Sequence, residues 1–198
     1  MACQVTFVCV ANRTRSVFSQ FFFQKMLTDK DENLAKEIKV LSAGFVPQRL
    51  KDQLNKAKIA FPEPFFNRGM TRVTREFLME RGIRVPDKWR SRELTSDMVK
   101  ESDLIITALP DQKEEMIVLY PGARERIFTI KELAEWDGYI IFEDYERPPL
   151  DHRYWHFVDE DPIYVSKILS VMEECLIRAF PNILRKLPIR TIQTARRY

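Results

Sequence analysis

The sequence predicts an α/β fold in which a parallel four-stranded sheet carries helices on both faces. Short apolar runs typical of buried strands alternate along the chain with segments whose apolar residues recur at helical spacing. Apolar residues make up 45% of the 198 residues, which is enough for one substantial core. We find no internal repeat or domain boundary and therefore expect a single domain over residues 1–198.

The expected elements follow from apolar periodicity and from the residues that end each run. Strands are expected at Val5–Val8, Ile38–Ser42, Asp103–Leu109 and Arg126–Ile130. Helices are expected near Ser16–Leu27, Met70–Arg81, Thr95–Lys100, Asp111–Leu119 and Pro162–Lys186. The proline-containing stretch Phe45–Arg68 is expected to be irregular, and Pro181 is expected to break the last helix.

The segment Cys9–Ser16 joins the first strand to the first helix and has the spacing Cys-x5-Arg-Ser. A loop that opens a helix turns several main-chain N–H groups toward one point, where the helix dipole adds positive charge. A phosphate suits that position, and the Arg15 guanidinium can hold two of its oxygens. The same field favours a thiolate at Cys9, which the Ser16 hydroxyl can reach. A buried apolar cysteine is the alternative, and the loop context favours the oxyanion site over it.

The loop Cys9-Val10-Ala11-Asn12-Arg13-Thr14-Arg15-Ser16 resembles the active-site loop of the low-molecular-weight protein tyrosine phosphatases. That family carries its general acid in a distant Asp-Pro pair, matched here by Asp161-Pro162. Three further segments resemble the family in the same order, so the resemblance covers roughly residues 3–180: Leu41–Gly44, Gly82–Thr95 and Ser102–Thr107. Compared with the family, the chain has insertions near residues 45–69 and 136–158.

The resemblance implies a cysteine-dependent hydrolase that acts on phosphotyrosine or another aryl phosphate through a phosphocysteine intermediate. Cys9 would be the nucleophile, Arg15 would stabilise the transferred phosphoryl group, and Asp161 would be the general acid. Asn12 would brace the loop, with Ser42 as its support, and Tyr164 would form one wall of the cleft. Phosphate contacts would come from the rest of the loop: Val10, Ala11, Asn12, Arg13, Thr14 and Ser16.

The chain departs from the family pattern at three positions, where Ala11 replaces a usual glycine, Val17 a usual proline and Trp89 a frequent histidine. Asp159 and Glu160 stand beside Asp161 as competing acids. No cofactor and no metal are expected, because the chemistry needs none and the pair His152 and His156 has no third ligand nearby.

Two other functions remain open at this point. The same loop would bind arsenate, so thiol-dependent arsenate reduction is one alternative, although Cys3 and Cys175 are not spaced as resolving thiols. A non-enzymatic module that binds phosphate or phosphotyrosine is the other. The expected partners are a phosphorylated protein or a small aryl phosphate, with inorganic phosphate or another oxyanion in the loop.

Charge, hydropathy and cysteine content argue against nucleic-acid-binding, membrane-spanning and secreted proteins. The formal net charge of +3 combines 32 basic and 29 acidic residues, which does not indicate a nucleic-acid-binding protein. No apolar run is long enough to span a membrane, and the N-terminus does not read as a secretory signal. Three cysteines without framework spacing indicate a reducing compartment, and we expect a cytoplasmic location.

Overall fold

The structure, a computed structural model, describes residues 2–56, 58, 64–137 and 161–189. Its strands form one sheet in the order β2-β1-β3-β4, and every neighbouring pair is parallel. This confirms the predicted four-stranded parallel sheet. The strands are β1 (Cys3–Cys9), β2 (Ile38–Gly44), β3 (Leu104–Thr107) and β4 (Ile127–Thr129).

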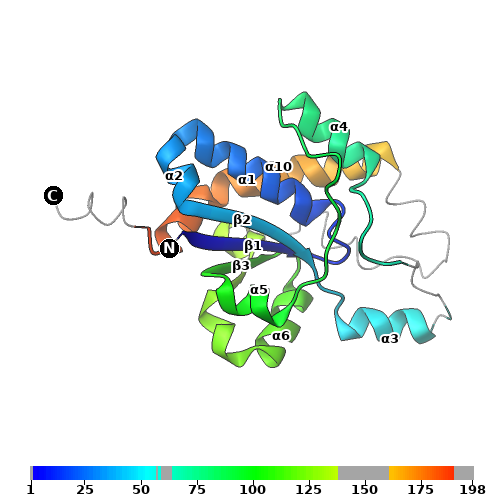
Figure 1. Ribbon diagram of the computed structural model, residues 1–198. Helices are drawn as coiled ribbons and strands as arrows, with labels where there is room; N and C mark the ends of the chain where they lie inside the picture. The colour runs from blue at the N-terminus through cyan, green and yellow to red at the C-terminus, as the bar shows by residue number, and fades with distance from the viewer. Residues whose placement is uncertain (1, 57, 59–63, 138–160, 190–198) are drawn as a thin grey trace.

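Helices cover both faces of the sheet, as predicted. Figure 1 shows α1 and α10 over one face and α5 and α6 over the other. The C-terminal ends of β1 and β2 point away from the N-terminus, toward α3 (Figure 1). The helices are α1 (Arg15–Lys30), α2 (Glu32–Glu37), α3 (Gln48–Lys56), α4 (Arg72–Glu80), α5 (Ser96–Glu101), α6 (Pro110–Leu119), the 3-10 helix η1 (Pro121–Arg126), α7 (Ile130–Leu133) and α10 (Pro162–Lys186).

Side chains of β1 alternate between two apolar clusters, one on each face of the sheet. Val5 and Phe7 belong to the larger cluster, which also contains side chains of α1, α4 and α10. Val8 belongs to the smaller cluster, with side chains of α5 and α6. β3 divides in the same way, with Ile106 in the larger cluster and Ile105 in the smaller. Strands buried on both faces read as continuous apolar runs, and for this reason the sequence predicts them well.

The ends of β1 and β2 meet at one edge of the sheet, where Cys9 is in register with Gly44. A Cβ atom at Gly44 would stand 2.6 Å from the carbonyl oxygen of Val10 and 2.3 Å from the Phe66 ring. Glycine is therefore needed for this close approach. The main-chain N–H of Phe45 donates to the carbonyl oxygen of Cys9 at 2.8 Å. The end of β2 thus fixes the base of the loop that follows β1.

The stretch Phe45–Arg68 was expected to be irregular, and this expectation was wrong because it contains α3. Leu50 and Leu54, one turn apart on α3, are both buried. The carboxylate of Glu115 on α6 accepts a hydrogen bond from the main-chain N–H of Gln48 at 2.6 Å. A negative charge at a helix N-terminus is stabilising. Because this charge comes from a distant part of the chain, the local sequence does not reveal it.

Pro181 was expected to break the last helix, but α10 continues through it to Lys186. Proline in a helix interior costs about 3 kcal/mol, since it removes a hydrogen bond and crowds the preceding turn. Beyond it, Ile183 and Leu184 are buried. Burying one such side chain contributes about 1.5–3 kcal/mol. Packing of the last turn against the core therefore offsets the cost of the proline.

Most of the insertion expected near residues 136–158 lies outside the described residues, and a single domain over residues 1–198 stays a prediction. Across the described ranges, no helix has the length and apolar character needed to span a membrane. Within the described residues, Cys3, Cys9 and Cys175 form no disulfide bond.

Candidate active site

Cys9 is the last residue of β1 and is only 3% exposed. Its Sγ atom lies 3.0 Å from the Oγ atom of Ser16, in the first turn of α1. A hydroxyl at this distance stabilises a thiolate by hydrogen bonding. The sequence predicted this proximity of Cys9 and Ser16, and the geometry confirms it.

The N-terminus of α1 has no side-chain cap. Thr14 precedes the helix, yet its side chain makes no capping hydrogen bond. By contrast, α4, α5, α7 and α10 are capped by Thr71, Thr95, Thr129 and Asp161, respectively. Helix N-terminal N–H groups without such a partner are available to an anion, and the dipole favours one.

The main chain of the loop offers further donors. Within the described residues, nothing accepts a hydrogen bond from the main-chain N–H of Val10, Ala11 or Thr14. Buried main-chain N–H groups are almost always paired in folded proteins. Together with the first turn of α1, these groups form a cradle for a tetrahedral oxyanion next to the Cys9 thiol.

Arg15 is the first residue of α1 and is only 2% exposed. Its guanidinium is permanently charged, and the burial of the side chain places that charge largely out of contact with water. An electrostatic interaction with an anion is stronger there than on an exposed surface. The chain thus places a buried cation at the helix end that faces the thiol.

Asn12 holds the loop in its shape. Its side chain is fully buried, with Nδ2 donating to Ser16 Oγ at 2.9 Å and Oδ1 accepting from the main-chain N–H of Arg92 at 3.0 Å. Asn12 also has a φ of 53°, the left-handed conformation that asparagine tolerates. The replacement of glycine by Ala11 causes no such strain, because Ala11 is not among the residues with positive φ.

Ser42 was expected to support Asn12, and this was wrong. Its hydroxyl donates instead to Oε1 of Gln20 on α1 at 2.6 Å. Trp89 does not support Asn12 either, since the buried indole N–H of Trp89 makes no hydrogen bond within the described part of the chain. The main chain of Arg92 and the hydroxyl of Ser16 brace Asn12 in their place.

Two segments distant in sequence support the outer side of the loop. Nε of Arg13 donates to the carbonyl oxygen of Gly69 at 2.9 Å, and the main-chain N–H of Thr71 donates back to the carbonyl oxygen of Arg13 at 3.1 Å. This segment is joined in turn to residue 91. Ser91 donates its main-chain N–H to the carbonyl oxygen of Arg68 at 2.8 Å, and its hydroxyl accepts from the N–H of Arg68 at 3.1 Å.

Asp161 is the N-cap of α10, and its Oδ1 accepts hydrogen bonds from the main-chain N–H groups of Ile163 and Tyr164 at 2.9 and 3.1 Å. Figure 1 shows this first turn of α10 at the same end of the molecule as the loop after β1. Tyr164 is half-buried beside Asp161. The competing acids Asp159 and Glu160 lie outside the described residues, so their places relative to the loop stay untested.

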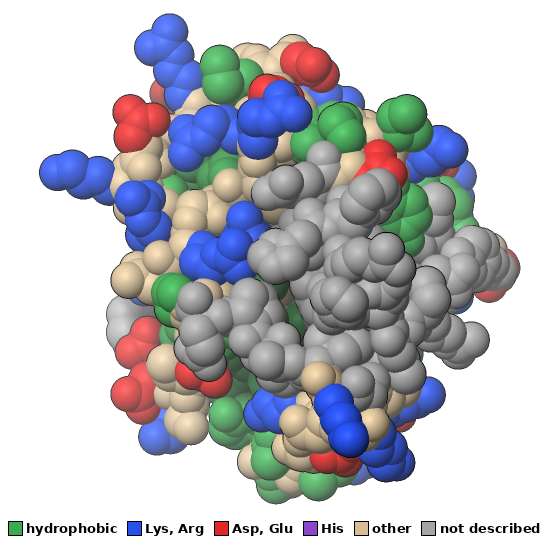
Figure 2. Space-filling model, turned by 90° about the vertical axis from the view of Figure 1, so that its right-hand side faces the viewer, with side chains coloured by type: hydrophobic (Ala, Val, Ile, Leu, Met, Phe, Trp, Pro, Cys, Tyr) green, Lys and Arg blue, Asp and Glu red, His purple; other side chains and the backbone are tan. Residues whose placement is uncertain are grey.

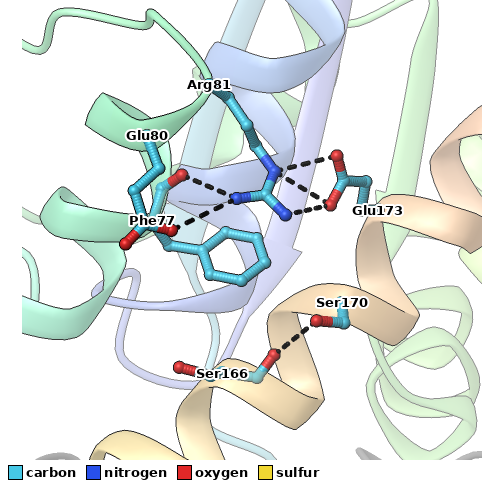
Figure 3. Close-up of polar contacts among 6 residues, drawn as sticks. All are labelled: Phe77, Glu80, Arg81, Ser166, Ser170 and Glu173. Carbon is cyan, nitrogen blue, oxygen red and sulfur yellow. Dashed lines mark hydrogen bonds and ion pairs between the residues drawn. The ribbon is translucent and has the colours of Figure 1, made fainter.

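An ion pair joins α4 to α10, the helix that carries Asp161. Figure 3 shows the Arg81 guanidinium facing the carboxylate of Glu173, with its Nη2 at 2.6 Å and its Nε at 2.8 Å from the two oxygens. The same guanidinium lies 3.5 Å from the centre of the Phe77 ring. Because α4 is capped by Thr71, which contacts the loop, this pair ties the helix that carries Asp161 to the loop's support.

The other two thiols lie away from this site. Cys3 is at the opposite end of β1, and burial, reinforced by the negative charges of Asp103 and Glu37, raises the pKa of its thiol. Cys175 is fully buried in α10. In the described ranges, no three His, Cys, Asp or Glu side chains come together as a metal site, while His152 and His156 lie outside those ranges.

Comparison with solved structures shows which proteins share this α/β fold. A protein tyrosine phosphatase from Entamoeba histolytica, with Hepes in the active site, matches with a TM-score of 0.65 at 16% identity over 93% of this chain and 98% of that chain. The low molecular weight protein tyrosine phosphatase from T. tengcongensis matches with a TM-score of 0.56 at 23% identity over 89% and 99%. YwlE arginine phosphatase from Geobacillus stearothermophilus matches with a TM-score of 0.57 at 14% identity over 92% and 96%.

The chain therefore has the fold of the low-molecular-weight protein tyrosine phosphatases, as its loop predicted. No protein-family model matches the sequence, and no curated protein matches it. The likeness lies in the backbone, where nearly the full length of each solved chain is matched at low identity.

Proposed function

We propose that this protein is a cysteine-dependent phosphatase that hydrolyses phosphotyrosine or another aryl phosphate through a phosphocysteine intermediate. One observation carries the proposal: Cys9 Sγ lies 3.0 Å from Ser16 Oγ, at the N-terminus of a helix that no side chain caps. A nucleophile and an oxyanion cradle thus share one position. The fold of tyrosine phosphatases supports the same reaction class.

In the first step the Cys9 thiolate attacks phosphorus, an S–P bond forms, and the P–O bond to the aryl group breaks. Asp161 gives its proton to the leaving phenolate oxygen. In the second step water attacks the phosphocysteine, ionised Asp161 takes a proton from that water, and the S–P bond breaks. Phosphate leaves and the thiolate is restored, so atoms and charge balance without a cofactor.

Arg15 and the main-chain donors would stabilise the charge that spreads over the three equatorial oxygens in both steps. Ser16 would stabilise the thiolate as it leaves phosphorus, since its hydroxyl already lies within hydrogen-bonding distance of the sulfur. Asn12 would keep Ser16 and the loop in this arrangement through its two hydrogen bonds.

Arsenate reduction within this chain has less support. A second thiol would have to reach an adduct on Cys9, yet Cys3 lies at the far end of the same extended strand, about 20 Å away. Cys175 is fully buried in a helix. We also propose a cytoplasmic location, because cysteines without disulfide bonds suit a reducing compartment.

The test is hydrolysis of p-nitrophenyl phosphate and of a phosphotyrosine peptide, with a phosphoarginine peptide as the competing substrate class. Wild type and Cys3→Ala should turn over the aryl phosphates, whereas Cys9→Ser should not. Rapid quenching with a 32P-labelled peptide should trap label on Cys9. Undiminished turnover in Cys9→Ser would exclude the mechanism, and a clear preference for phosphoarginine would exclude the aryl substrate.

The same variants distinguish an enzyme from a non-enzymatic binding module. Cys9→Ser should still bind phosphate, vanadate or sulfate, because the cradle consists of main-chain donors and Arg15. If wild type binds these anions but turns over neither aryl phosphates nor phosphoarginine, the protein is a binding module rather than an enzyme.

A further inference from the structure

We propose, building on the function above, that the preferred substrate is a phosphorylated segment of a protein with acidic residues beside the phosphorylated side chain. Three arginines around the loop would recognise those residues: Arg68, Arg90 and Arg92, called here the basic rim. Small aryl phosphates would fill the cradle without reaching the rim.

Two of the rim residues, Arg68 and Arg92, are held near the loop by hydrogen bonds of their main chain. Arg92 donates its N–H to Asn12 Oδ1 at 3.0 Å, and its carbonyl oxygen accepts from the N–H of Gly44 at 2.8 Å. Arg68 is joined to Ser91 through two hydrogen bonds. The Cα atoms that carry these arginines therefore have fixed positions beside the cradle.

The rim has uncompensated positive charge. Arg90 and Arg92 are exposed, Arg68 is half-exposed, and none of the three forms an ion pair with another residue in the described ranges. Arg90 uses Nη1 only on the nearby carbonyl oxygens of Asp87 and Trp89. Some exposed arginines elsewhere are paired, as Arg72 is with Glu76. Figure 2 looks onto this end of the molecule, where Lys and Arg side chains are spread over its left and upper parts.

An acidic peptide fits this arrangement better than a nucleic acid. The rim consists of three arginines on two segments joined near the cradle, and the chain as a whole carries a net charge of only +3. Single-stranded nucleic acids need a long basic groove with exposed aromatic rings for stacking. Carboxylates on either side of one phosphorylated residue need only a few arginines near the cradle, which is the pattern here.

Binding to the Cys9→Ser variant tests the inference without requiring turnover. Two fluorescent phosphotyrosine peptides of equal length would be compared by anisotropy, one with Asp and Glu at the flanking positions and one with Asn and Gln. The acidic peptide should bind at least fivefold more tightly at low salt, and the difference should shrink as salt rises. An RNA oligonucleotide of similar charge serves as competitor.

The rim variants locate the effect. Arg68→Gln, Arg90→Gln and Arg92→Gln should each reduce the acidic-over-neutral ratio by roughly twofold to fivefold, the range of one exposed charge pair. Their main-chain hydrogen bonds are retained. Arg124→Gln is the matched control, because Arg124 is exposed in η1 before β4, at the other end of the sheet, and it should leave the ratio unchanged.

Three outcomes would overturn the basic rim: equal affinities for the two peptides, a ratio that the rim variants leave intact, or stronger binding of the RNA than of the acidic peptide. The proposed function is tested separately by turnover of p-nitrophenyl phosphate in wild type. If that turnover is present but the ratio is one, only the rim is wrong. If turnover is absent but the acidic peptide still binds more tightly than the neutral one, the basic rim is supported and the protein is a phosphopeptide-binding module.

Discussion

Replacing Asn12 by alanine tests whether the loop shape depends on this one side chain. Asn12 is fully buried, has a φ of 53°, and joins Ser16 to the main chain of Arg92. Alanine removes both hydrogen bonds and leaves the N–H of Arg92 without its acceptor. It also places a Cβ-bearing residue without a polar side chain in the left-handed conformation.

The expected loss of stability is the sum of these terms. Two net hydrogen bonds contribute about 1 kcal/mol each, and the left-handed backbone adds about 1 kcal/mol for alanine. The free energy of unfolding should therefore fall by about 3 kcal/mol. For a chain of this size that corresponds to a drop in Tm of about 6–12 °C.

Calorimetry or thermal unfolding followed by circular dichroism measures this change, and Asn12→Gly is the control. Glycine loses the same hydrogen bonds but adopts positive φ without strain, so it should be about 1 kcal/mol more stable than the alanine variant. Phosphate should raise the Tm of wild type more than that of either variant. If Asn12→Ala keeps wild-type stability, or if glycine is the less stable of the two, the assigned role of Asn12 is incorrect.

Three further predictions concern charge. Arg15→Lys should lose nearly as much kcat as Arg15→Ala, because an ammonium cannot reproduce the bidentate fork, and near-normal turnover in the lysine variant would refute this. Asp161→Asn should slow hydrolysis of phenyl phosphate far more than that of p-nitrophenyl phosphate, since only the poorer leaving group needs the proton; equal slowing would assign the acid elsewhere. Arg81→Gln should lower the free energy of unfolding by about 1–3 kcal/mol in denaturant titrations, and Arg178→Gln, which removes an exposed pair with Glu174, should change it by less than about 0.5 kcal/mol.

The sheet could be predicted from the sequence because its strands are buried on both faces. Val5–Val8 and Asp103–Leu109 are mostly apolar runs, and each is followed by a segment of helical spacing. α3 could not be predicted, since the charge that stabilises its N-terminus belongs to Glu115, far along the chain. The continuity of α10 through Pro181 likewise depends on tertiary packing that local propensity does not describe.

In the candidate site, too, some contacts could be predicted from the sequence and others could not. The contact between Cys9 and Ser16 was predictable because both residues belong to one strand-loop-helix segment. The contact between Asn12 and Arg92 was not, because it joins residues 80 apart through a main-chain N–H, a group that every residue except proline carries. Ser42 was assigned to the wrong partner because the packing of α1 on β2 brings Gln20 within reach of its hydroxyl.

The shape of the loop is therefore a property of three segments of the chain, although its chemistry lies in one. Gly69 and Thr71 hold Arg13, and Arg92 holds Asn12, so the spacing between thiol, hydroxyl and helix end depends on residues outside the segment Cys9–Ser16. A site preorganised in this way stabilises charge without rearranging during the reaction. The same hydrogen bonds carry Arg68 and Arg92 to the edge of the cradle. Under the two proposals, support of the loop and selection of the residues beside the phosphorylated side chain would come from one set of hydrogen bonds.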